Sequence, residues 1–345
     1  MTVPVVFLES RKPTMVCVLP ACLEIKSCIL CVQLSGCSKF SPYFVRIAGL
    51  LQSGIFKFFD MNNEPTPRKL SQAELDQLWQ ENFIIEKESK ASIVKDWLPR
   101  YTGMPLDQFG EYILLVNFGG YVKDFAELHG VPVSGMDRPM QAATAGGITI
   151  INFGIGSPNA GLVIDLLEAI KPKAVLFLGK CGGLKTGKNH NGDLILPIAA
   201  IRGEGTSNDY LPPEVPALPA FALQKAVSTT IREYERDYWT GVVYTTNKRV
   251  WEHREDFKKN LRDLRCIAID METATIFVAA FKNQMPAGAL LLVSDMPMTR
   301  EGIKTEASDK IVTTQFAKTH LAIGVDSLKQ LMNHGTTVKH LRFEL

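Results

Sequence analysis

From about residue 111 onward, short apolar runs alternate with segments whose apolar residues recur every three or four positions. The apolar runs predict buried strands, and the three-to-four spacing predicts amphipathic helices. The predicted strands are residues 111–118, 147–153, 173–178, 193–200, 241–246 and 288–293. The predicted helices are residues 122–128, 157–170, 221–238 and 306–332, with a further one beginning near Ala274. This alternation predicts a single three-layer α/β/α domain whose central sheet is covered by helices on both faces.

Glycine-rich turns follow three of the predicted strands. Gly119-Gly120 follows the first, and Gly154-Ile-Gly156 follows the second, with Ser157 as N-cap and Pro158 in the first helical turn. Residues 179–183 are predicted to end the third strand in a loop. The turns lack the spacing of a P-loop or of a dinucleotide-binding fingerprint. Neither P-loop nucleotide binding nor NAD binding is therefore predicted.

The start of the chain differs from the rest. Residues 15–34 are apolar enough to resemble a signal sequence, but Glu24 and Lys26 interrupt them and no cleavage site follows. We expect residues 1–60 to be a poorly structured extension that is not part of the native product. Residues 61–100 are predicted to be helical, beginning with a capping box at Ser71 and Glu74 and broken from Arg100 onward. Residues 101–345 then form the catalytic domain.

Composition narrows the choice of function. Of 345 residues, 46% are hydrophobic and 21% charged, as in an ordinary globular α/β protein. The 38 basic and 36 acidic residues nearly balance, which gives no reason to expect nucleic acid or an acidic membrane as a partner. Cys28 and Cys31 have no second ligand pair, so no metal site is predicted. Cys181 and Cys266 lie in core-like runs, consistent with reduced thiols and a cytoplasmic location.

Two acidic motifs near the end of the chain are the candidate site. Asp270-Met271-Glu272 stands where an apolar run gives way to a helical pattern, and Ser294-Asp295 ends a predicted strand. Strand ends are where open α/β sheets place ligand chemistry. A structural reading is also open, because carboxylates are favoured near a helix N-terminus and Asp295 precedes a proline turn.

Five segments together resemble the nucleoside phosphorylase and nucleosidase superfamily over most of residues 100–335. They are Gly154-Ile-Gly-Ser-Pro-Asn-Ala160, Leu178-Gly-Lys-Cys-Gly-Gly183, Arg202-Gly-Glu-Gly-Thr-Ser207, Asp270-Met-Glu272 and Ser294-Asp295. Pro99-Arg-Tyr-Thr-Gly103, residues 244–252 and Ser294-Asp-Met-Pro297 are similar to the AMP nucleosidase branch. The resemblance implies a phosphorylase-type fold with a mixed sheet, a homo-oligomer, no cofactor, and hydrolysis of AMP by water to adenine and ribose 5-phosphate.

The same resemblance assigns roles to the acidic motifs. Glu272 is expected to hold the ribose hydroxyls, Met271 to pack on the sugar, and Asp295 to protonate the leaving purine. An aspartic acid titrates near 3.9, and raising its pKa to neutrality costs about 4 kcal/mol. Apolar neighbours such as Val293 would provide the desolvation, with Arg300 opposing it.

Anion-binding residues depart from the phosphorylase pattern. Where phosphorylases have two arginines and a serine for inorganic phosphate, this chain has Tyr121 or Val122, Phe177 and Lys180. Losing several charge-assisted hydrogen bonds, each worth about 1.5–3 kcal/mol, favours water over phosphate as the nucleophile. The Gly179-Lys180 segment, with Arg100, Arg138 or Arg249, is the candidate site for a substrate 5′-phosphate, although each arginine also suits a surface role.

Three further residues complete the predicted site. Thr206 and Ser207 are candidate ligand contacts, or ordinary turn residues, and Glu204 is the candidate base that activates water. Three alternatives to the nucleosidase remain open: a purine or uridine nucleoside phosphorylase, a catalytically silent nucleotide-binding protein, and an unrelated α/β ligand sensor.

Overall fold

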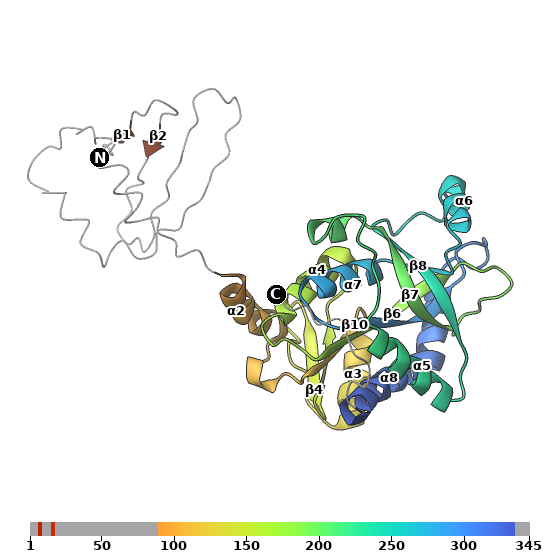
Figure 1. The fold of residues 1–345 in the computed structure, drawn as a ribbon, viewed down its shortest axis with the longest axis horizontal. Helices are drawn as coiled ribbons and strands as arrows, with labels where there is room; N and C mark the ends of the chain where they lie inside the picture. The colour runs from red at the N-terminus through yellow and green to blue at the C-terminus, as the bar shows by residue number, and fades with distance from the viewer. Residues whose placement is uncertain (1–5, 9–14, 18–88, 335–345) are drawn as a thin grey trace, which may run out of the picture. The chain divides into compact units, whose positions relative to one another are not determined.

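The computed structural model describes residues 6–8, 15–17 and 89–334 (Figure 1). The chain divides into two compact units, residues 1–87 and 88–345. In the first unit, β1 (Val6–Leu8) pairs antiparallel with β2 (Met15–Cys17). The predicted capping box at Ser71 and the beginning of the predicted helical segment lie outside the described residues.

The second unit is built on one eight-stranded mixed sheet. Its strands are β3 (Tyr112–Val116), β4 (Gln141–Ala145), β5 (Ile148–Asn152), β6 (Ala174–Gly183), β7 (Leu194–Gly203), β8 (Tyr238–Thr246), β9 (Ala268–Asp270) and β10 (Ala287–Asp295). They lie in the order β10-β7-β8-β9-β6-β3-β5-β4. β3, β5, β6 and β10 run parallel, whereas β9 is antiparallel to β6 and β7 is antiparallel to β10. Because β10 also pairs with β6, the strands β10, β7, β8, β9 and β6 form a closed ring of pairings.

Helices pack against this sheet in two groups. They are α2 (Lys90–Thr102), α3 (Gly119–His129), α4 (Ser157–Leu167), α5 (Phe221–Glu233), α6 (Glu255–Asp263), α7 (Thr273–Lys282) and α8 (Glu306–His334), with 3-10 turns η2 (Leu106–Gln108) and η3 (Thr206–Asp209). α4 packs on α7, and α8 packs on α5 and α3 (Figure 1). Within the described ranges, no helix has the length and apolarity needed to cross a membrane.

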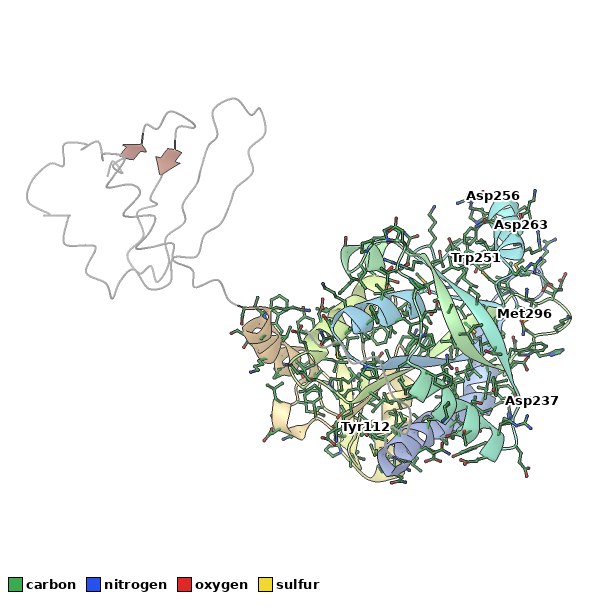
Figure 2. The ribbon with its side chains drawn as sticks, viewed as in Figure 1. Tyr112, Asp237, Trp251, Asp256, Asp263 and Met296 are labelled. Atoms are coloured by element: carbon green, nitrogen blue, oxygen red, sulfur yellow. The ribbon has the colours of Figure 1, made fainter. Side chains whose placement is uncertain are left out.

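Both faces of the central strands are buried, which explains their continuous apolar sequence. Successive side chains of a strand point to opposite faces. Leu290 and Leu176 accordingly belong to one apolar cluster, with Phe125, while their neighbours Leu291 and Phe177 belong to another. Side chains fill the space between the sheet and the helices in Figure 2. β6 and β10 pair side by side within this core, and their ends carry the candidate site.

The main departure from the sequence prediction is the length of β6. The predicted loop at residues 179–183 is strand, because Gly179 pairs with Leu291 of β10 and Gly182 pairs with Ile269 of β9. Glycine is needed there for packing, since a Cβ on Gly179 would lie 2.5 Å from the Phe177 ring. Pairing partners far along the chain override the local turn signal.

Smaller differences occur at helix ends. α2 continues past the predicted break at Arg100 to Thr102 and ends at Gly103, whose φ of 67° is the left-handed conformation that glycine adopts readily. The predicted helix at residues 221–238 ends at Glu233, because Tyr238 begins β8 and pairs with Leu194. β4, β9 and α6 were not predicted.

Candidate active site

A cavity of about 390 Å³ opens at the ends of β3, β6 and β10. The residues after β8 and β9 complete its wall. Its lining residues are Asn117, Phe118, Ile155, Lys180, Cys181, Gly182, Thr246, Lys248, Arg249, Trp251, Glu252, Ile269, Asp270, Met271, Glu272, Ser294, Asp295, Pro297, Lys304 and Asp309. The two predicted acidic motifs therefore face one cavity, although β9 and β10 belong to opposite strand directions.

Glu272 is an almost fully buried carboxylate, with 2% of its surface exposed. It accepts hydrogen bonds from the backbone N–H groups of Gly156, at 2.7 Å, and of Met271, at 3.3 Å. Burial raises the pKa of Glu272 to about 8, and the neighbouring charge of Asp270 adds to the effect. Asn117 also hydrogen-bonds to Glu272, while its buried Oδ1 has no partner among the described residues. This corner of the cavity thus offers acceptors to a ligand's hydroxyl groups.

Asp270 stabilises the N-terminus of a helix, which was the structural alternative considered for the Asp270-Met271-Glu272 motif. It accepts hydrogen bonds from Thr245 Oγ1 and from the backbone N–H of Thr273, each at 2.7 Å, and so fixes the start of α7 to β8. Glu272 stands at the N-cap position of α7 but makes no side-chain capping bond. The helix-start reading therefore holds for Asp270, and the Glu272 side chain faces the cavity.

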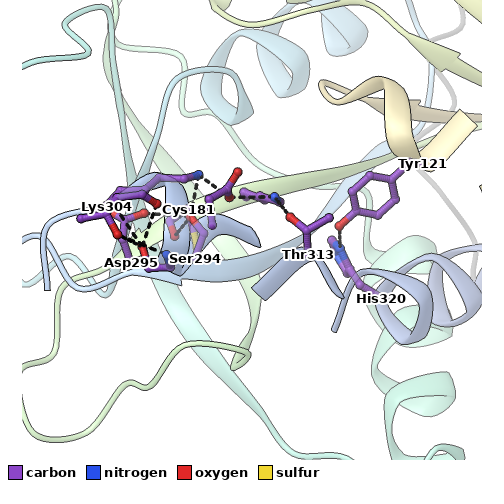
Figure 3. Close-up of polar contacts among 11 residues, drawn as sticks. Tyr121, Cys181, Ser294, Asp295, Lys304, Thr313 and His320 are labelled. Carbon is purple, nitrogen blue, oxygen red and sulfur yellow. Dashed lines mark hydrogen bonds and ion pairs between the residues drawn. The ribbon is translucent and has the colours of Figure 1, made fainter. Parts of the chain in front are cut away.

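Asp295 ends β10 and is 8% exposed. Ser294 Oγ donates to its Oδ1 at 2.8 Å (Figure 3). Burial raises the pKa of Asp295, against the opposing effects of the Ser294 hydrogen bond, Lys304 and Arg249. The expected desolvation is thus present, but the opposing charges are Lys304 and Arg249, whereas the sequence had suggested Arg300.

Two lysines meet at Asp309 on the same side of the cavity as Asp295, and Lys304 Nζ donates to Ser294 Oγ at 3.4 Å. Lys180 Nζ lies 2.9 Å from Asp309 Oδ1 and donates to Thr313 Oγ1 at 2.7 Å, and Lys304 Nζ lies 3.0 Å from the same Asp309 oxygen (Figure 3). Both ammonium groups lie over the ring of Phe118, at 4.6 and 5.7 Å from its centroid. Burial lowers the pKa of Lys180, and the pairing with Asp309 opposes that shift. Burial would raise the pKa of Asp309, but its bonds to the two lysines outweigh this and lower it.

Half of the predicted site residues line the cavity. Asp295, Glu272, Met271, Lys180 and Arg249 do so. Gly179, Arg100, Glu204, Thr206 and Ser207 do not. Gly179 is enclosed within β6, and Arg100 lies on the exposed side of α2, 3.4 Å from Asp96.

Glu204 directly follows β7, and its side chain hydrogen-bonds to residues of η3 and α7. Its Oε1 accepts hydrogen bonds from the Ser207 backbone N–H at 3.0 Å and from Thr275 Oγ1 at 2.8 Å. Arg202 Nε donates to Ser207 Oγ at 2.9 Å. These side chains bind one another, and the structure places Glu204 away from the cavity in which a water-activating base would act.

Several cavity residues had no sequence signal strong enough to single them out. Asn117 and Phe118 end the first predicted strand and directly follow β3, so their position at a strand end was the one available signal. Lys248 and Glu252 lie in the segment used for the branch-level resemblance. Asp309, in the first turn of α8, had no such signal. Among the described residues, no three histidine, cysteine or acidic side chains are grouped to hold a metal ion.

The mixed sheet, with Asp295 at the end of β10 and Glu272 at the start of α7, agrees with the nucleoside phosphorylase fold that the comparisons identify. Residues 111–329 match the family described as the phosphorylase superfamily, and the chain belongs to that superfamily. Its relatives are nucleoside-processing enzymes, and the predicted resemblance to AMP nucleosidases is confirmed.

Three relatives illustrate the range of similarity. The crystal structure of AMP nucleosidase from Bacteroides thetaiotaomicron is 52% identical, covers 72% of this chain and 100% of that one, and has a TM-score of 0.64. The AMP nucleosidase of Escherichia coli K12 is 28% identical over 69% of this chain, and the chain spans 58% of that relative's length. Uridine phosphorylase from Vibrio fischeri shares the fold, with 21% identity, coverage of 65% and 93%, and a TM-score of 0.59.

Proposed function

We propose that this protein hydrolyses the N-glycosidic bond of AMP, releasing adenine and ribose 5-phosphate. The observation that carries the proposal is the placement of Glu272 and Asp295 on one cavity that also contains Lys180 and Arg249. One carboxyl group is thus available to the sugar, one to the base, and cations to the phosphate. The similarity to proteins named AMP nucleosidases supports the same choice.

Asp295 is the proposed general acid. Breaking the bond from ribose to a purine builds negative charge on the base, which a proton delivered to N7 neutralises. Since burial raises the pKa of Asp295, its protonated form is more accessible than in water. A positioned general acid typically contributes about 10²–10⁴ in rate.

Glu272 is the proposed ligand for the ribose 2′ and 3′ hydroxyl groups. Its backbone donors from Gly156 and Met271 fix its orientation, so its remaining acceptor capacity can point at the sugar. The free Oδ1 of Asn117 provides a further acceptor in the same corner. Met271, which lines the cavity, would pack against the pentose.

Water is the proposed nucleophile, because the cavity lacks the predicted partners of inorganic phosphate. Phe177 replaces one expected arginine and is buried in the apolar core, and Lys180 replaces the serine. The cations available to a 5′-phosphate are Lys180 and Arg249, as predicted, together with Lys248 and Lys304. We also propose a cytoplasmic location and a homo-oligomeric state, and light scattering of the purified protein would test the oligomeric state.

The direct test incubates the protein with AMP, adenosine or uridine, each with and without inorganic phosphate, and identifies the sugar product. Ribose 5-phosphate formed from AMP without added phosphate supports the proposal. The competing function is a nucleoside phosphorylase, suggested by Arg202-Gly-Glu-Gly-Thr-Ser207. A ribose 1-phosphate product that forms only when phosphate is added would establish that function and reject ours.

A further inference from the structure

Asp309 places a carboxylate between the two lysines of the cavity. Lys180 and Lys304 approach the same oxygen, Oδ1, at 2.9 and 3.0 Å. The Lys180 side chain is 4% exposed and that of Asp309 is 34% exposed, so the carboxylate is the more accessible partner. Thr313, one turn further along α8, accepts a third contact from Lys180 at 2.7 Å. The arrangement is a pair of converging cations, and the Asp309 carboxylate already balances one of their two positive charges.

Converging ammonium groups are what a phosphoryl anion requires. The ring of Phe118 also contacts both cations but carries no formal charge. Because burial lowers the pKa of Lys180, an anion on this site also keeps Lys180 protonated. Asp309 supplies that anion in the ligand-free protein, at the position where an incoming phosphoryl oxygen would bind.

We propose that Asp309 determines which phosphoryl anions enter the cavity, acting as an internal counter-ion in the place that free inorganic phosphate would take. The proposal rests on the proposed hydrolysis, since exclusion of phosphate leaves water as the nucleophile. A free phosphate must displace a like charge using only its own contacts. A nucleotide phosphoryl group is held nearby by its bound nucleoside, so it competes at a high effective concentration.

The test removes the charge but keeps the shape. Asp309→Asn retains an oxygen that accepts hydrogen bonds, and Glu306→Gln removes one exposed carboxylate from the same first turn of α8. No ion pair of Glu306 is found among the described residues, which makes it a matched control. Binding of inorganic phosphate is measured by titration calorimetry at pH 7 and constant ionic strength. We expect Asp309→Asn to bind phosphate at least about tenfold more tightly than wild type, and Glu306→Gln to match wild type.

Failure of this proposal can be distinguished from failure of the proposed function, because titration with phosphate measures binding and needs no turnover. Equal phosphate affinity in Asp309→Asn and Glu306→Gln overturns the proposal. If Asp309→Asn does not fold, as judged by its thermal transition, Asp309→Ser is measured in its place. Titrations with AMP and adenosine, made in the Asp295→Asn background so that turnover of AMP is suppressed, identify the source of the anion. A gain for AMP but not adenosine shows that the nucleotide's own phosphoryl group uses these lysines, whereas a gain confined to phosphate assigns them to the free anion.

Discussion

Replacing Asp295 by asparagine tests the role of its ionisable proton while leaving the other groups of the site in place. The amide oxygen can still accept the hydrogen bond that Ser294 Oγ makes at 2.8 Å, so the local geometry is retained. Only the ionisable proton is lost. Since a general acid contributes about 10²–10⁴, turnover of AMP should fall by at least about 100-fold, equivalent to about 3 kcal/mol or more of transition-state stabilisation. Binding of AMP should survive.

Stability should respond in the opposite direction. Burial raises the folded-state pKa of Asp295 above its value in the unfolded chain. The ionised group therefore destabilises the folded state at pH values above the folded pKa, and the cost disappears as the group is protonated at lower pH. At pH 7 the neutral asparagine removes this cost, so the midpoint of thermal unfolding should stay the same or rise.

The assay is release of adenine from AMP under saturating conditions, with unfolding followed by circular dichroism. Glu301→Gln is the control, since it removes an exposed carboxylate six residues further along the same segment. Turnover of Asp295→Asn within about threefold of wild type would refute the general-acid role. A loss of turnover accompanied by a large drop in melting temperature would show that the carboxyl group serves folding instead.

Three further predictions follow from the placement of the other predicted residues. For wild type, kcat/KM should show an inflection near pH 8, because Glu272 must be ionised to accept two hydroxyl donors, together with a decline as rising pH removes the Asp295 proton, and Glu272→Gln should lack the inflection near 8. Glu204→Ala removes the acceptor of Thr275 and should lower the free energy of unfolding by about 1–3 kcal/mol, measured in urea, while kcat stays within about threefold of wild type. Gly179→Ala places a Cβ 2.5 Å from the Phe177 ring and should cost about 1–3 kcal/mol of stability by overpacking.

Each of these has a contrary outcome. A pH profile of the Glu272→Gln variant that keeps the inflection near 8 would assign it to another group. A Glu204→Ala protein with normal stability and no turnover would return Glu204 to the catalytic machinery. An unchanged unfolding midpoint for Gly179→Ala would show that the neighbouring ring relaxes to accept the methyl group.

Much of the fold could be predicted from the sequence because its signals are local. The apolar runs of β3, β5 and β10 and the helical spacing of α4 and α8 depend on neighbours a few positions away. The glycine segment at 179–183 was misread because its local signal is that of a turn. Its actual structure depends on pairing with β9 and β10, more than 80 positions further along the chain.

The kinds of element and the two acidic motifs could be predicted from the sequence alone, since Glu272 stands where a helical pattern begins and Asp295 ends a buried run. Only the tertiary structure decided which polar groups share their cavity. Lys180 meets Asp309 across 129 positions, whereas Glu204, inside an equally suggestive motif, turns toward Thr275. The sequence around a charged residue does not show which distant residue it will pair with. Such contacts depend on how the strands and α8 pack in the folded protein.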